Sequence, residues 1–93
     1  MNPHVERYRY TTEDRKELEM GDAAWPYIRR RAGELADETQ APVLLFVFNP
    51  TMRRWEYLRK TLPGGESYDW NGNGPFVLRP DACGYILKEG GQA

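Results

Sequence analysis

The sequence predicts an α+β fold in which one long helix lies on an antiparallel sheet, in the order β-β-α-β-β-β-β. Three observations support this class. A single amphipathic stripe runs through residues 22–39, short β-branched and aromatic runs stand on both sides of it, and turn residues separate those runs. The 93 residues are expected to form one domain, residues 1–93, with flexible tails at 1–3 and 89–93.

The segment before the helix is predicted to form a β-hairpin. VERYRY, residues 5–10, and KELEM, residues 16–20, flank the polar turn sequence TTEDR. The sequence leaves open whether residues 12–20 are strand or helix. Their two apolar side chains, Leu18 and Met20, are two positions apart, and this spacing favours a strand.

The helix is predicted over residues 22–39. Asp22 is the expected N-cap, because its carboxylate can accept a free backbone N–H and is stabilised by the helix dipole. Pro26 stands in the first turn, where a missing N–H costs least, and Pro42 ends the helix. The apolar stripe has i, i+3, i+4 spacing and consists of Trp25, Ile28, Ala32, Leu35 and Ala36.

After the helix, VLLFVF (43–48) and RRWEYLRK (53–60) predict a second hairpin, with a connection at 49–52. The expected register places Phe48 opposite Arg53, Phe46 opposite Trp55 and Leu44 opposite Tyr57. One face of this hairpin then carries Leu44, Phe46, Phe48, Trp55 and Tyr57, and the other carries Val43, Leu45, Val47 and Leu58. PFVLR (75–79) and GYILK (84–88) predict the last two strands.

A strand that is apolar on both faces requires a cover on both. The single helix, about 27 Å long at ~1.5 Å per residue, can cover only one of them. The second face must therefore be covered by the segment 62–87, by a second copy of the chain, or by a partner, because several large apolar side chains left in water are unfavourable.

Composition excludes several classes of function. A formal net charge of −1 creates no general attraction to nucleic acid or to an anionic membrane. Cys83 is the only cysteine, so no internal disulfide can form. The N-terminus lacks the apolar segment of a signal peptide, and no run approaches the length of a transmembrane helix. The expected location is the cytoplasm.

The stretch DWNGNG resembles the beginning of a calcium loop, since Asp69, Asn71, Asn73 and Gly74 match its positions one, three, five and six. The twelfth position, which needs a bidentate glutamate, is Pro80. Asn-Gly pairs also supply the positive φ of tight turns, and we interpret the stretch as a turn.

Other chemical signals are weak. His4 and Cys83 have no neighbouring catalytic or metal-binding partner in the sequence. Glu17, Glu19 and Asp22 could gather around metal ions, as in a metal-dependent nuclease, but alternating carboxylates usually form a solvated face. We therefore expect no enzyme activity, no cofactor and no bound metal.

The expected function is a small non-catalytic domain that binds another protein, such as an inhibitor or adaptor; the example of a phage or mobile-element anti-defence protein comes by elimination. Aromatic and arginine side chains on one strand are typical of protein–protein hot spots. The expected partner-binding residues are Arg53, Arg54, Trp55, Tyr57 and Arg59. A nucleic-acid-binding domain using the same strand is the alternative, and the nuclease a third. A homodimer also remains open.

Overall fold

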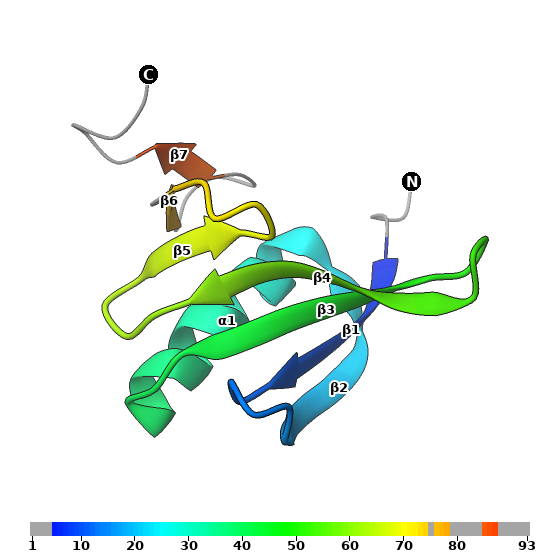
Figure 1. Ribbon diagram of the computed structural model, residues 1–93, viewed down its shortest axis with the longest axis horizontal. Helices are drawn as coiled ribbons and strands as arrows, with labels where there is room; N and C mark the ends of the chain where they lie inside the picture. Colours follow the sequence, from blue (N-terminus) through cyan, green and yellow to red (C-terminus); the bar gives the residue numbers. More distant parts are fainter. Residues whose placement is uncertain (1–4, 75, 79–84, 88–93) are drawn as a thin grey trace.

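The computed structural model describes residues 5–74, 76–78 and 85–87. Within them one helix and seven strands are found, and all the strands belong to one antiparallel sheet in the order β2-β1-β3-β4-β5-β6-β7 (Figure 1). The elements are β1 (Val5–Thr11), β2 (Glu17–Ala24), α1 (Trp25–Thr39), β3 (Val43–Asn49), β4 (Arg54–Thr61), β5 (Glu66–Asp69), β6 (Phe76–Leu78) and β7 (Tyr85–Leu87). The predicted α+β class, with one helix and an antiparallel sheet, is confirmed.

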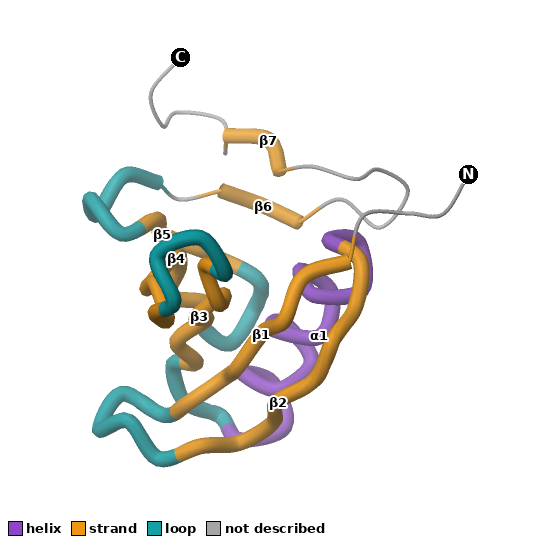
Figure 2. Tube along the Cα trace, turned by 90° about the vertical axis from the view of Figure 1, so that its right-hand side faces the viewer, coloured by secondary structure: helices purple, strands orange, loops and turns teal. Residues whose placement is uncertain are grey.

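Helix α1 covers one face of this sheet. Its buried stripe, Ile28, Ala32, Leu35 and Ala36, packs against the side chains that β1 and β3 turn toward it, namely Tyr8, Tyr10, Val43 and Leu45. Figure 2 shows α1 on one side of the strands. The described part of the chain contains no helix with the length and apolarity needed to cross a membrane.

The predicted helix start is wrong. Strand β2 continues through Asp22 to Ala24, the helix begins at Trp25, and its N-cap residue Ala24 provides no side-chain hydrogen bond. Asp22 instead lies opposite Arg7 of β1. Pairing with β1 satisfies the backbone of residues 22–24 in the sheet, and this outweighs the local preference of Asp22 for a cap. The helix end at Thr39 agrees with the prediction.

Two further differences concern the strands. The open question about residues 12–20 is settled, since 12–16 form a turn and β2 starts at Glu17. Strand β5 was not predicted, because the four residues ESYD have neither an apolar alternation nor a β-branched run. Tertiary pairing with β4 on one side and β6 on the other makes them a strand.

The β3–β4 hairpin has the predicted faces but not the predicted register. Phe48 lies opposite Trp55 and Phe46 opposite Tyr57, while Leu44 lies opposite Lys60. The turn is displaced by one residue, to 50–53, because the Asn49 Oδ1 accepts the backbone N–H groups of Thr51 and Met52 at 3.0 and 3.1 Å. A shift of two residues in the pairing leaves Trp55 and Tyr57 on their predicted face, and the alternation changes only beyond Tyr57.

Candidate functional site

The face of the sheet that points away from α1, here called the outer face, carries a group of aromatic and basic side chains, most of them partly exposed. It is formed because Tyr8 and Tyr10 enter the core, so that Arg7 and Arg9 of the same strand point outward. Its members are Arg7, Arg9, Met20, Leu44, Phe46, Phe48, Trp55, Tyr57 and Lys60.

The aromatic side chains of the outer face are arranged in two cross-strand pairs. The rings of Phe48 and Trp55 meet edge to face with centroids 5.4 Å apart, and those of Phe46 and Tyr57 are tilted at 5.5 Å. Such pairs add to the stability that burial alone provides. The pairs form a continuous aromatic patch along β3 and β4.

Two arginines lie over this patch. The guanidinium of Arg9 is 4.5 Å from the centroid of Trp55, and that of Arg15, from the β1–β2 turn, is 5.2 Å from the centroid of Phe46. Both distances are within the range of cation–π attraction. The arginines thus cover part of each ring with a planar cation and with their aliphatic stems.

The outer face is therefore partly covered by the chain itself. Leu44 and Phe46 are only 7% and 9% exposed, whereas Phe48, Trp55 and Tyr57 are half-buried. The described strands of the segment 62–87 do not fold across this face, because they extend the sheet beside β4. The half of the aromatic patch nearest the β3–β4 turn is left open to solvent.

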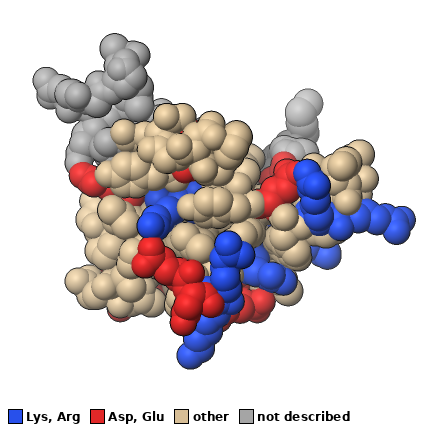
Figure 3. All heavy atoms as spheres, viewed as in Figure 1, with Lys and Arg blue, Asp and Glu red and all other residues tan. Residues whose placement is uncertain are grey.

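Most basic groups around the outer face have an acidic partner. Burial raises the pKa of the Tyr57 hydroxyl, and the hydrogen bond to Glu13 raises the pKa of Lys60. Figure 3 shows basic and acidic side chains side by side over this view of the molecule. The ion pairs are Arg7–Asp22 at 3.2 Å, Arg9–Glu17 at 3.4 Å, Arg54–Glu56 at 3.3 Å and Lys60–Glu13 at 2.8 Å.

Two shallow hollows open on the outer face. One, of about 380 Å³, is lined by Trp55 with Met20 and Arg9 among its neighbours, and the other, of about 390 Å³, is lined by Phe48. Both also include Arg7. Met20 is 51% exposed although it is apolar. Exposed apolar groups beside hollows with a polar border are features of surfaces that bind other molecules.

The predicted partner-binding residues are not all brought together. Trp55 and Tyr57 lie on the outer face, and the exposed Arg53 and Arg54 lie at the β3–β4 turn. The register shifts between Leu45 and Phe46, which makes Arg59 the neighbour of the core residue Leu45. Arg59 therefore does not share the outer face with Trp55 and Tyr57, although the alternation of an unbroken strand from Trp55 to Arg59 would have placed it there.

Sequence reasoning placed Phe48 on the same face as Trp55 and Tyr57, but it did not name Phe48, Arg9 or Lys60 among the partner-binding residues. Lys60 occupies the position beside Tyr57 because the bulge in β4 reverses the alternation after it. The alternation of arginine and tyrosine in VERYRY was a signal for Arg9, since it predicts arginines on one face of β1 and tyrosines on the other.

The three carboxylates considered for a metal site do not converge. Glu17 pairs with Arg9 and Asp22 with Arg7 on the outer face, whereas Glu19 points to the helix side. Among the described residues no group of three His, Cys, Asp or Glu side chains could hold a metal ion. His4 and Cys83 lie outside those residues, as do the predicted tails.

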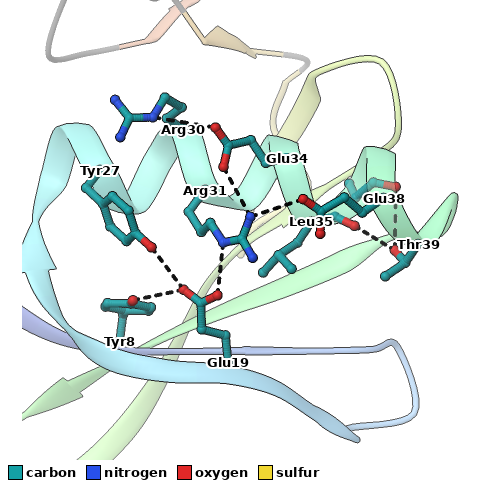
Figure 4. A network of polar contacts seen from close by, with 10 residues as sticks. Tyr8, Glu19, Tyr27, Arg30, Arg31, Glu34, Leu35, Glu38 and Thr39 are labelled. Atoms are coloured by element: carbon teal, nitrogen blue, oxygen red, sulfur yellow. Dashed lines mark hydrogen bonds and ion pairs between the residues drawn. The ribbon is translucent and has the colours of Figure 1, made fainter.

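Glu19 joins β2 to α1 (Figure 4). Its Oε1 accepts the Arg31 Nε at 2.9 Å, and its Oε2 accepts the hydroxyls of Tyr8 at 2.9 Å and Tyr27 at 3.3 Å. Partial burial raises the pKa of Glu19, but the hydrogen bonds from Arg31 and Tyr8 outweigh it, so that the pKa lies below its ordinary value. Burial and the hydrogen bond to Glu19 raise the pKa of Tyr8. All of these groups are already partnered, and the cluster is a structural junction.

The stretch DWNGNG forms a turn. The Asp69 Oδ1 accepts the backbone N–H groups of Asn71 at 3.0 Å and Asn73 at 2.9 Å, so this carboxylate closes the turn by hydrogen bonds. Gly72 and Gly74 have φ of 84° and 148°. Pro80, at the twelfth position, lies outside the described residues.

No protein-family model, curated protein or solved structure matches the chain. Function must therefore be inferred from the side chains that the fold presents. Of the features described above, the outer face is the one that combines exposed apolar area, rigidly paired aromatics and arginines.

Proposed function

We propose that the protein is a small non-catalytic domain that binds another protein through its outer face, as inhibitors and adaptors do. The observation that carries this proposal is the half-buried aromatic patch with Arg9 stacked on Trp55. Tryptophan, tyrosine and arginine dominate the binding energy of protein interfaces, where they cluster in the centre of the contact. We place the interaction in the cytoplasm, in keeping with the single cysteine of the sequence.

The aromatic patch is preorganised for binding. Trp55 is held between the edge contact with Phe48 and the guanidinium of Arg9, and Tyr57 is held by Phe46. Side chains that are already fixed lose little conformational entropy when a partner arrives. Met20, which is exposed and unbranched, can adapt to an irregular partner surface.

The distribution of charge favours a protein over a nucleic acid as the partner. Phosphate binding depends on cations that neutralise the backbone and release counterions. On the outer face Arg7, Arg9 and Lys60 each have a carboxylate within 3.4 Å, so that the charge of these three groups is balanced locally. Mixed charges at the border of an aromatic patch are typical of the rim of a protein interface.

The test is affinity capture from extracts of the source cells, with wild type, Trp55→Ala and a control. Arg30→Ala is a suitable control, because Arg30 is exposed on α1, on the opposite side of the sheet, and its contacts, an ion pair with Glu34 at 3.6 Å and a cation–π contact with Tyr27 at 5.6 Å, both lie on the helix itself. We expect Trp55→Ala to reduce binding of the captured protein at least tenfold, as for a hot spot of about 1.4 kcal/mol or more. The control should bind as wild type does.

Salt and subunit number separate the alternatives. A protein interface should weaken little between ~50 and 200 mM salt, whereas phosphate-driven binding falls steeply over that range. Light scattering on the pure protein reports whether a second copy occupies the outer face. Full binding by a folded Trp55→Ala variant would refute the proposal.

A further inference from the structure

Strand β4 has an unpaired edge in the middle of the sheet. β3 pairs with β4 over the whole length of β4, but β5 pairs only with Arg59, Lys60 and Thr61. Residues 54–58 therefore have β3 on one side and, among the described residues, no strand on the other. Alternate backbone N–H and C=O groups of this stretch, here called the β4 edge, point away from β3, and no described strand pairs with them there.

A groove of about 660 Å³ runs along the β4 edge. It is lined by Arg54, Trp55, Glu56, Tyr57 and Leu58 in unbroken succession, together with Trp70. Successive side chains of a strand point to opposite faces, so a hollow that touches five consecutive residues must lie along the edge and not on one face.

Trp70 forms the far wall of this groove. Its side chain is 64% exposed, which is unusual for tryptophan, and it follows directly on β5. The turn that carries it is fixed by Asp69, which accepts two backbone N–H groups of that turn. The groove is thus bounded by a strand edge on one side and, on the other, by an exposed aromatic side chain carried on a hydrogen-bonded turn.

We propose that the β4 edge binds an extended peptide segment of the partner as an additional strand of the sheet. The inference rests on the proposed function and names the part of the partner that is recognised. Unpaired backbone groups at regular spacing select a chain in the extended conformation, as in other cases of strand addition. Five residues of such a segment, about 17 Å at ~3.3 Å per residue, match the length of the β4 edge.

The same geometry disfavours a second copy of this protein as the occupant. A strand that belongs to a folded sheet brings its own neighbouring strand with it, some 4.8 Å further out. Trp70 lines the groove together with the β4 edge, so the neighbouring strand of a second sheet would meet its side chain.

Charge and side-chain position give the segment its chemistry. Trp55 and Tyr57 stand on one face of the β4 edge and offer contacts to alternating apolar side chains of the segment. At the end near the turn, Arg53 is exposed and makes no ion pair within the described residues. Glu56 is already paired with Arg54 and Asn49. The segment is therefore expected to alternate apolar residues and to carry an acidic residue at the end beside Arg53.

The probe is a phage-displayed library of linear twelve-residue peptides, selected on the immobilised protein. We expect enrichment of peptides with alternating apolar residues and an acidic end. A synthetic copy of an enriched peptide should slow hydrogen exchange of amides within 54–58. The alternate amides of this peptide form two sets, and only one set faces the β4 edge. N-methylation of that set should weaken binding at least tenfold, and N-methylation of the other set should not. Trp70→Ala should weaken it at least fivefold, and Met52→Ala, at the exposed tip of the turn, should not.

Failure to enrich any peptide, or a footprint of slowed exchange elsewhere than 54–58, would overturn the inference. The inference would also be overturned if the two peptides, N-methylated at one or the other set of alternate amides, bound equally well. These results leave the proposed function standing if Trp55→Ala still abolishes capture of the intact partner. Conversely, slowed exchange at the β4 edge with a captured partner that is indifferent to Trp55→Ala would reject the outer face and keep the edge.

Discussion

Replacing Glu19 by glutamine tests whether the junction between β2 and α1 contributes to stability. The carboxylate accepts three hydrogen bonds, from Arg31, Tyr8 and Tyr27. The Glu19 and Arg31 side chains are 23% and 22% exposed, so the pair lies between an exposed ion pair, at about 0–1 kcal/mol, and a fully buried one whose disruption costs about 3–5 kcal/mol. In the variant, the glutamine NH₂ replaces one carboxylate oxygen and would face a hydrogen-bond donor, either Arg31 or the two tyrosine hydroxyls. We expect a loss of about 2 kcal/mol in the free energy of unfolding.

The assay is thermal and urea unfolding of wild type, Glu19→Gln and Glu38→Gln. A loss of about 2 kcal/mol corresponds to a fall in Tm of about 8–16 °C for a domain of this size. Glu38 is the matched control, because it pairs with the same Arg31 at 3.2 Å but is 61% exposed. Its substitution should cost less than about 0.5 kcal/mol. If both variants lose the same small amount, the reasoning about burial is refuted.

The effect of Glu19 should also depend on pH. The pKa of Glu19 in the folded protein lies below its ordinary value of 4.5, so the folded state binds its proton less tightly than the unfolded state does. Its contribution is therefore complete above that ordinary value and is lost as the pH falls through the pKa of the folded state. The difference between wild type and Glu19→Gln should be constant near neutral pH and shrink in acid. A difference that does not change with pH would contradict this assignment.

Three further substitutions or additions test the fold. Tyr10→Phe removes the hydroxyl that donates to the buried carbonyl of Ile28, and denaturant unfolding should show a loss of about 1 kcal/mol in the free energy of unfolding. An unchanged free energy of unfolding would mean that water replaces this hydrogen bond. Gly74→Ala would place a Cβ 2.7 Å from the Ser67 carbonyl oxygen at a φ of 148°, so thermal unfolding should reveal a loss of about 1–3 kcal/mol. Millimolar calcium should leave Tm unchanged, because the Asp69 carboxylate accepts N–H groups of its own turn; a rise in Tm would reverse this interpretation.

The spacing of apolar residues along the sequence was sufficient to predict the helix and the central strand. The stripe through Ile28, Ala32 and Leu35 predicted the helix and its buried side, and the helix ends at Thr39 as expected. The unbroken apolar run of residues 43–48 predicted a strand with apolar side chains on both faces, which the structure places in the core and on the outer face. These properties depend on residues a few positions apart, and so the sequence reveals them directly.

The candidate site was predicted only in part. Trp55 and Tyr57 were recognised because both belong to one strand and are two positions apart. The predicted hairpin also placed Phe48 on their face, but Arg9 comes from β1 and is 46 residues before Trp55 in the chain. Contacts of this kind leave no periodic signal in the sequence, since any of several strands could have been the neighbour.

Sequence alone determined the class of fold, the extent of the amphipathic stripe and the excess of apolar side chains on the central hairpin. Only the tertiary structure decided the start of the helix, the bulge that moves Arg59 off the outer face, and the short β5 that leaves part of β4 unpaired. The physical reason is that a strand can form backbone hydrogen bonds with any of several distant strands, and local sequence preference does not distinguish these pairings. The choice among them is made by which arrangement buries the most apolar surface and satisfies the most backbone groups together.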